Sequence, residues 1–205
     1  MNREETKMKK KLVATLLTAA MVCSMGAVSA VSVAAEEADT LTIGFSQVGA
    51  ESDWRTANTE SMKTTFSEEN GYELIFDDAQ QKQENQVTAI RNFIQQEVDY
   101  ILLAPVTETG WDTVLQEAKD AGIPVIIVDR MVDVSDDSLY TSWIGTDALL
   151  EGRKAAEWLN AFATAKEIAP EDLHIVDIQG TIGSTAQIGR TQGLEEGVEK
   201  YGWDL

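Results

Sequence analysis

Cysteine and histidine are almost absent from this sequence of 205 residues, which has one of each, Cys23 and His174. A single cysteine cannot form an intramolecular disulfide, so the fold has to rely on its hydrophobic core. His174 lies within an apolar, strand-like segment, and nothing in the sequence suggests partners for a Ser-His-Asp triad or a histidine-ligated zinc site. We therefore expect no metal and no catalytic residues, and we interpret His174 as a histidine packed in the core.

Positive charge is also scarce, with 16 Lys and Arg residues against 35 Asp and Glu residues and a formal net charge of −19. Residues 1–35 hold five of the basic and two of the acidic side chains, so the rest of the chain has 11 against 33. This balance argues against nucleic acid or an anionic membrane surface as a partner, because both are polyanions. The acidic surplus is typical of a solvated surface.

The sequence has no phosphate-binding fingerprint, and we expect no cofactor. Gly44 and Gly49 are followed by the carboxylates of Glu51 and Asp53, which would repel a phosphate, and Gly180 and Gly183 come without the lysine of a P-loop. For residues 180–185 we favour a tight turn in which Ser184 or Thr185 caps the following helix.

The N-terminal segment, residues 1–35, resembles an export signal. Lys9–Lys11 are basic, Leu12–Val33 is an apolar run with small residues, and Ser32–Ala35 offers a small-residue cleavage site. The alternative is a permanent membrane anchor. Cys23 is either a lipid-attachment site or an ordinary signal residue, and we favour the latter. We expect an exported protein in the periplasm or on the outer face of the cell envelope, without a stable membrane span once the signal is removed.

From Thr40 onward, apolar runs alternate with amphipathic stretches. Because the runs are continuously apolar, they predict a doubly wound α/β fold whose parallel sheet is covered on both faces. The predicted strands are 41–46, 72–76, 100–103, a run after Pro124, a short strand around Trp143 and Ile144, and 173–178. The predicted helices are 54–69, one in which Val87, Ile90, Phe93 and Ile94 share a face, 111–121, 147–162, and one from the turn at 180–185 to Lys200. Trp203–Leu205 resembles the entry to another strand, which suggests a C-terminally truncated fragment.

Two polar clusters directly follow predicted strands. The loop Glu51–Arg55 follows the first strand, and Asp129-Arg130 follows the fourth. Ligands of open parallel sheets bind outside the carboxyl ends of the strands, so both clusters are expected to face one crevice. Carboxylates and guanidinium groups bind neighbouring sugar hydroxyls in pairs, and the indole of Trp54 would cover the apolar face of a sugar ring.

Simpler interpretations of these clusters remain open. Asp53 is a candidate cap of the first helix, and Asp129-Arg130 a candidate surface ion pair. The carboxylates of Glu51, Asp53 and Asp129 would also suit a glycosidase, which we consider the weaker hypothesis. Arg190, on the helix after the turn at 180–185, is either a surface charge or a contact to the same crevice from a second lobe.

Several motifs resemble type I periplasmic binding proteins for monosaccharides, the ribose- and galactose-binding group of ABC importers. The resemblance runs from about Leu41 to the end of the chain, and the loop Glu51–Arg55 is its most telling motif. The motifs are Gly44–Gly49, Glu51–Arg55, Gln80–Gln86, Ala104–Val106 with Thr109–Trp111, and Val128–Arg130.

This resemblance implies a non-enzymatic solute-binding protein whose ligand is a monosaccharide of the galactose type, in furanose form, and whose partners are ABC permease subunits. It implies that Glu51, Trp54, Arg55, Asp129 and Arg130 contact the sugar from the first lobe, with Arg190 from the second. Ser52 and Asp53 belong to the same loop and are included as candidate contacts.

Family members consist of two similar lobes, and the sugar is held between them. The resemblance implies that residues 36–145 form most of the N-terminal lobe and that residues 146–205 begin the C-terminal lobe. It also implies a monomer. The rival interpretation is the ligand-binding domain of a sugar sensor or regulator, although a regulator would carry a DNA-binding helix-turn-helix where this chain has an export signal.

Overall fold

The computed structural model describes residues 40–205, so the predicted export signal and Cys23 lie outside the described residues. The strands are β1 (Leu41–Gln47), β2 (Tyr72–Asp78), β3 (Tyr100–Leu103), β4 (Val125–Asp129) and β5 (Ser142–Gly145). The α-helices are α2 (Asp53–Thr65), α3 (Gln83–Gln95), α4 (Asp112–Asp120), α5 (Ala148–Ala165) and α6 (Thr185–Tyr201).

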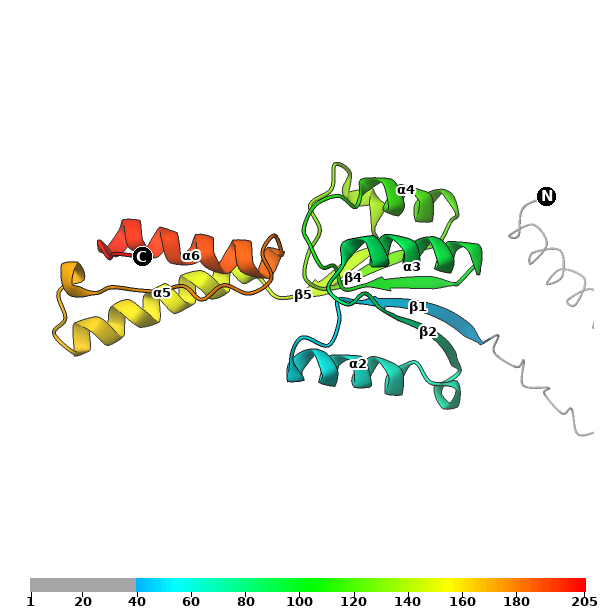
Figure 1. The fold of residues 1–205 in the computed structure, drawn as a ribbon, viewed down its shortest axis with the longest axis horizontal. Coiled ribbons are helices and arrows are strands. Elements are labelled where there is room, and N and C mark those ends of the chain that lie inside the picture. Colours follow the sequence, from blue (N-terminus) through cyan, green and yellow to red (C-terminus); the bar gives the residue numbers. More distant parts are fainter. Residues whose placement is uncertain (1–39) are drawn as a thin grey trace, which may run out of the picture. The chain divides into compact units, whose positions relative to one another are not determined.

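The five strands form one parallel sheet in the order β2-β1-β3-β4-β5. Helix α2 covers one face of this sheet, and α3 and α4 cover the other (Figure 1). The predicted doubly wound α/β fold is therefore confirmed. Parallel pairing brings the carboxyl ends of all five strands to the same edge, where a ligand site is expected.

The core has one hydrophobic layer on each face of the sheet. Under α3 and α4 it includes Phe93, Trp111 and Leu115, each at most 2% exposed. Under α2 it includes Phe45, which is fully buried. Gly44 faces α3, and a Cβ at this position would lie 2.5 Å from the Phe93 ring, so glycine is required for the helix to approach the strand.

Helices α5 and α6 pack along each other, and each begins at a side-chain cap. The Asp147 carboxylate accepts a hydrogen bond from the Leu150 amide, and the Ser184 hydroxyl accepts one from the Gln187 amide. The sequence predicted a cap at Ser184 or Thr185, and the structure has it at Ser184. Gly152 and Gly193 let the two backbones approach closely, because a Cβ on either residue would meet the opposite helix.

The expectations for residues 173–178 and His174 were wrong. This segment forms only an isolated bridge between His174 and Asp204, and the side chains of Val176 and Ile178 are 84% and 91% exposed. A β-strand requires a continuous neighbour for its hydrogen bonds, and the described residues provide none here. The His174 side chain is 71% exposed, and its Nδ1 lies 3.0 Å from the Asp204 carboxylate.

The first helix is shorter than predicted, because α2 ends at Thr65 and a separate 3₁₀ turn follows at Glu68–Asn70. Gly71 then adopts a left-handed conformation that ends the turn before β2 begins, as the Asn-Gly pair indicated.

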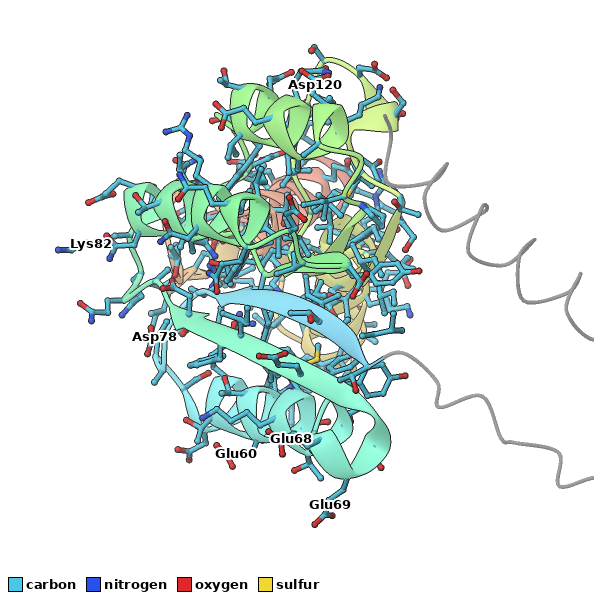
Figure 2. The ribbon with its side chains drawn as sticks, turned by 90° about the vertical axis from the view of Figure 1, so that its right-hand side faces the viewer. Glu60, Glu68, Glu69, Asp78, Lys82 and Asp120 are labelled. Atoms are coloured by element: carbon cyan, nitrogen blue, oxygen red, sulfur yellow. The ribbon has the colours of Figure 1, made fainter. Side chains whose placement is uncertain are left out.

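Acidic side chains project from the surface of the sheet domain. Figure 2 shows Glu60 on α2, together with Glu68 and Glu69 in the turn that follows, pointing outward. This arrangement agrees with the solvated acidic surface expected from composition. Between residues 40 and 205, no helix has the length and apolar character needed to cross a membrane.

Candidate functional site

Arg55 joins the two polar clusters at the carboxyl edge of the sheet. Its Nε donates to Glu51 Oε1 at 3.0 Å within its own loop, and its Nη2 donates to Asp129 Oδ2 at 2.7 Å at the end of β4. The Arg55 side chain is only 3% exposed. The structure thus brings together the first and fourth strand ends, as the sheet topology predicted.

One donor of Arg55 is left without a partner. Its Nη1 is buried and makes no hydrogen bond within residues 40–205. A buried guanidinium donor without an acceptor is unfavourable, so Nη1 is the one unsatisfied group of the Arg55 side chain among the described residues.

Arg130 is the second buried guanidinium of the site, but its contacts are longer. Its Nη1 donates to the carbonyl of Val106 at 3.1 Å, and its Nη2 lies 3.7 Å from Glu51 Oε1. Burial, with a further effect from the positive charge of Arg55, lowers the pKa of the Arg130 guanidinium below its usual value. The site thus brings two guanidinium groups and two carboxylates together, with side chains that are 3–20% exposed.

Trp54 supplies the aromatic surface of the site. Its side chain is 57% exposed, and its ring centroid lies 4.9 Å from the guanidinium carbon of Arg55. The contact with Arg55 restrains the indole and leaves more than half of its surface available to solvent or ligand.

The structure assigns different local roles to Ser52 and Asp53. Ser52 is the cap of α2, and its hydroxyl accepts a hydrogen bond from the Arg55 amide at 3.1 Å. Asp53, which we considered as that cap, is instead the exposed first residue of the helix. Both residues belong to the capping class, and the extended backbone of Ser52 decides between them. The Ser52 cap fixes the start of the helix that carries Trp54 and Arg55.

Arg190 lies on α6 in an ion pair with Glu151, with its Nη2 2.8 Å from Glu151 Oε2. Together with Arg130 it lines a cavity of about 140 Å³, whose wall also includes Asp177, Gln179 and Thr181. The side chain of Arg190 is 56% exposed, so it is the most accessible of the three arginines.

Two threonines that were not site candidates contact the second cluster or the residue next to it. Arg130 Nη2 donates weakly to Thr181 Oγ1 at 3.4 Å, and the Met131 amide donates to Thr185 Oγ1 at 2.9 Å. Their segment was interpreted only as a turn and a helix cap. A run of small polar residues before a helix was the only available signal, and it does not distinguish capping from other contacts.

The backbone of Asp129 adopts a left-handed conformation, with φ of 65°, which is uncommon for a residue other than glycine. The indole Nε1 of Trp143 donates to the Asp129 carbonyl at 3.1 Å. Gly145 pairs with Asp129 in the sheet, and a Cβ there would collide with that carbonyl. Trp143 and Gly145, both absent from our candidates, therefore help to fix Asp129 in the conformation that meets Arg55.

Asp77 gives a testable pH dependence beside the site. Its Oδ1 is buried without a hydrogen-bond partner in the described chain, and burial, followed by the charge of Asp78, raises its pKa. When the pKa of a carboxyl is higher in the folded than in the unfolded state, stability falls as the pH rises from the unfolded-state pKa to the folded-state pKa. The loss of stability persists at neutral pH. Asp77→Asn should therefore raise the melting temperature at neutral pH, and the gain should vanish near about pH 4.

The matched control for this prediction is Glu73→Gln, an exposed position on the same strand. It corrects for the general benefit of removing one negative charge from an acidic protein. Thermal melts of both variants across the pH range make the comparison. Equal gains at every pH would show that burial of Asp77 has no particular effect.

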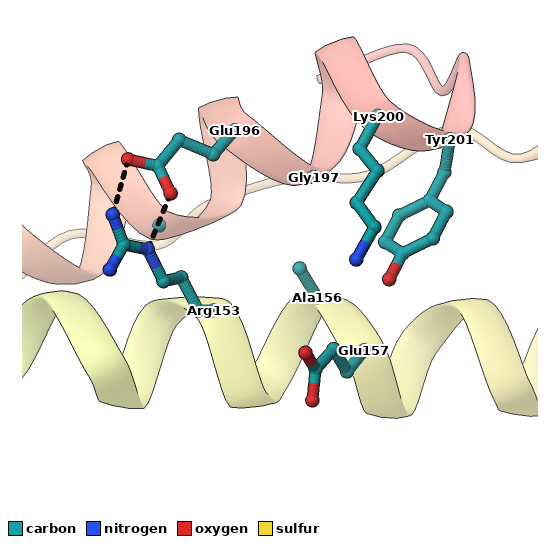
Figure 3. Close-up of a pocket in the computed structure, with 8 residues that line it drawn as sticks. Arg153, Ala156, Glu157, Glu196, Gly197, Lys200 and Tyr201 are labelled. Atoms are coloured by element: carbon teal, nitrogen blue, oxygen red, sulfur yellow. Dashed lines mark hydrogen bonds and ion pairs between the residues drawn. The ribbon is translucent and has the colours of Figure 1, made fainter.

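A larger cavity, about 300 Å³, lies between α5 and α6. In it, Arg153 binds Glu196 through Nε at 2.5 Å and Nη2 at 3.0 Å (Figure 3). Its lining includes Ala156, Gly193 and Gly197, and Lys200 and Tyr201 stand at one end. The main charges are thus paired with each other, and the groove follows from small residues at the helix contact. Residues 40–205 contain no group of three or more side chains suited to holding a metal ion.

Comparison with known proteins identifies one domain family. The model for the periplasmic binding protein domain matches residues 43–205. The chain is 46% identical over 175 residues to the galactofuranose-binding protein YtfQ of Escherichia coli K12, a match that covers 84% of this chain and 53% of that relative.

Solved structures give the same result. A protein from Mycobacterium smegmatis in complex with β-D-fucofuranose is 51% identical with a TM-score of 0.72, over 78% of this chain and 51% of that one. The binding protein of the arabinose ABC transporter from Shewanella sp. ANA-3, bound to α- and β-L-arabinofuranose, is 48% identical with a TM-score of 0.70, over the same shares. The chain spans about half the length of these relatives.

Proposed function

We propose, from the premise that this chain belongs to the periplasmic binding protein domain family, that the protein binds a monosaccharide in furanose form for an ABC importer. The observation that carries the proposal is the cluster of Glu51, Asp129 and Arg130 around the buried Arg55, beside the exposed indole of Trp54. Paired carboxylate and guanidinium groups match adjacent ring hydroxyls, and the indole matches a C–H face. The sugars named for the three relatives above are galactofuranose, fucofuranose and arabinofuranose.

In this proposal the five side chains above are the sugar contacts from the sheet domain, and Arg190 adds a contact from α6. Ser52 acts by fixing the start of α2, and Asp53 stays a candidate at the exposed rim. Residues 36–145 form most of the N-terminal lobe, and residues 146–205 begin the C-terminal lobe. The protein is exported, acts as a monomer, and delivers its sugar to permease subunits.

The protein acts by binding without turnover in this proposal. Of the three carboxylates considered for a glycosidase, Glu51, Asp53 and Asp129, the first and last both accept hydrogen bonds from Arg55. Each is thus held as an acceptor in an ion pair, which suits hydroxyl recognition better than proton delivery to a leaving group.

Calorimetry on the product of the complete reading frame tests this function. Methyl β-D-galactofuranoside and methyl β-D-galactopyranoside lock the two ring forms, so they separate ring size from sugar identity. We expect the furanoside to bind in the micromolar range or tighter and the pyranoside at least about tenfold more weakly, which is about 1.4 kcal/mol. Free L-arabinose, D-fucose, D-ribose and a nucleoside complete the panel.

Tight nucleoside binding without sugar binding would contradict the proposal, and so would a preference for the pyranoside. Release of nitrophenol from a nitrophenyl galactofuranoside would contradict the non-enzymatic part alone.

A further inference from the structure

Gln86 is a fully buried polar residue of α3 that lies outside the cluster of candidate sugar contacts. Its Nε2 donates to the carbonyl of Ala104 at 2.7 Å, and its Oε1 accepts from the amide of Val106 at 2.8 Å. A second, weaker contact joins Nε2 to the Ser46 carbonyl at 3.5 Å. One side-chain amide therefore holds the chain on both sides of Pro105.

The segment that Gln86 holds is packed in the core but has few other hydrogen bonds. Strand β3 ends at Leu103, Ala104 makes the last ladder-like bond to Ser46, and Pro105 has no amide hydrogen to donate. The Val106 amide is buried, so without the Gln86 oxygen it would lose its partner. The side-chain amide takes the place of the missing strand neighbour.

Val106 leads directly to the site, because its carbonyl accepts the hydrogen bond from Arg130 Nη1 at 3.1 Å. The other contacts of that guanidinium are longer, 3.4 Å to Thr181 and 3.7 Å to Glu51. The Val106 carbonyl is therefore the main fixed acceptor that sets the orientation of Arg130.

We propose that Gln86 is a positioning residue for the ligand site, which orients Arg130 through the backbone of Val106. The inference rests on the proposed function, because the ligand that Arg130 contacts is the furanose proposed above. Gln86 itself touches no ligand in this proposal. Its amide sets the Val106 carbonyl, and that carbonyl holds the guanidinium plane ready for a sugar hydroxyl.

A double-mutant cycle between Gln86 and Arg130 tests the proposal in the product of the complete reading frame. Gln86→Met keeps the volume and removes both hydrogen bonds, and we expect it to weaken furanoside binding about tenfold. In the Arg130→Ala background the same change should weaken binding less than about threefold, because its target is gone. Equal losses in both backgrounds would mean that Gln86 acts through general packing, and the proposal would be wrong.

Gln83→Met is the matched control. Gln83 lies on the same helix and donates to the Thr109 carbonyl at 2.7 Å, in the same connection between β3 and α4. Within residues 40–205 the Gln83 side chain forms no hydrogen bond with Arg130 or Val106, so binding should change less than about twofold. If Gln86→Met does not fold, Gln86→Asn replaces it, because this variant keeps a neutral amide that is one methylene too short to bond both Ala104 and Val106. We expect this variant to weaken furanoside binding about threefold, and we expect no such loss in the Arg130→Ala background.

A second readout is independent of sugar binding. The arginine side-chain N–H signals of the ligand-free protein are recorded by ¹H–¹⁵N NMR, and the Arg130 signal is assigned by its loss in Arg130→Ala. We expect Gln86→Met to shift or broaden this signal, while Gln83→Met leaves it unchanged. An unperturbed Arg130 signal in folded Gln86→Met would overturn the positioning role. Absence of sugar binding by the unmodified protein would instead refute the proposed function alone.

Discussion

Replacing Arg55 by Met should destabilise the protein by about 3 kcal/mol and abolish measurable sugar binding, because Glu51 and Asp129 would lose their close ion-pair partner and keep only Arg130, which lies 3.7 Å from Glu51. The Arg55 side chain is 3% exposed, and the carboxylates are 18% and 20% exposed, so water cannot replace the lost partner fully. Urea unfolding with and without the substitution measures the effect, and Met preserves most of the side-chain volume.

Arg91→Met is the matched control for this prediction. Arg91 also forms a two-bond ion pair, with Glu117 at 2.8 Å, but the two side chains are 49% and 38% exposed. Exposed pairs contribute about 1 kcal/mol or less. Adding Glu51→Gln and Asp129→Asn to Arg55→Met should recover part of the lost stability, since the uncompensated charges are then removed. A variant without any recovery would show that packing, and not charge, is what Arg55 provides.

The sheet domain was predictable because its signals are local. Each strand is a short apolar run ended by a glycine, a proline or a polar loop, and such runs predict a buried parallel sheet. The meeting of Arg55 and Asp129 follows from one further rule, that the carboxyl ends of parallel strands share an edge. The sequence alone therefore predicted that Arg55 and Asp129, 74 positions apart, lie close together.

The errors at residues 173–178 and His174 have a different cause. An apolar run indicates that a segment can become a buried strand, but burial also needs a neighbour whose hydrogen bonds continue along it. Here only His174 and Asp204 pair, and the histidine is exposed. Sequence periodicity describes one segment at a time and carries no information about the partner.

Gln86, although part of the Gln80–Gln86 motif, and Trp143 were not site candidates, because their roles depend on tertiary contacts. Glutamine is common in helices and tryptophan is common in strands, so neither residue indicates a special role by its position in the sequence. Their partners, the Val106 amide and the Asp129 carbonyl, are backbone atoms that any residue type supplies. No residue pattern marks such a contact, so only the folded geometry could identify these two residues as supports of the site.

Arg130→Ala should separate sugar affinity from stability, in contrast to the change at Arg55. We expect furanoside binding to weaken by about 2 kcal/mol, roughly 30-fold, because a desolvated guanidinium that makes paired bonds to hydroxyls is lost. Stability should change little, because burial and the charge of Arg55 lower the pKa of Arg130 and thus disfavour its charged form in the folded protein. Its contacts to Val106, Thr181 and Glu51 are also the weaker ones of the site.

Calorimetry and thermal melts on the product of the complete reading frame measure the two effects of Arg130→Ala separately. His174→Gln is the control, because its side chain is 71% exposed and contacts Asp204, and we expect neither quantity to change. Equal losses of affinity in both variants would mean that the sugar does not bind at Arg130. A loss of stability as large as that of the Arg55 variant would mean that Arg130 is a structural ion-pair partner, and that the long distances around its guanidinium do not reflect readiness for a ligand.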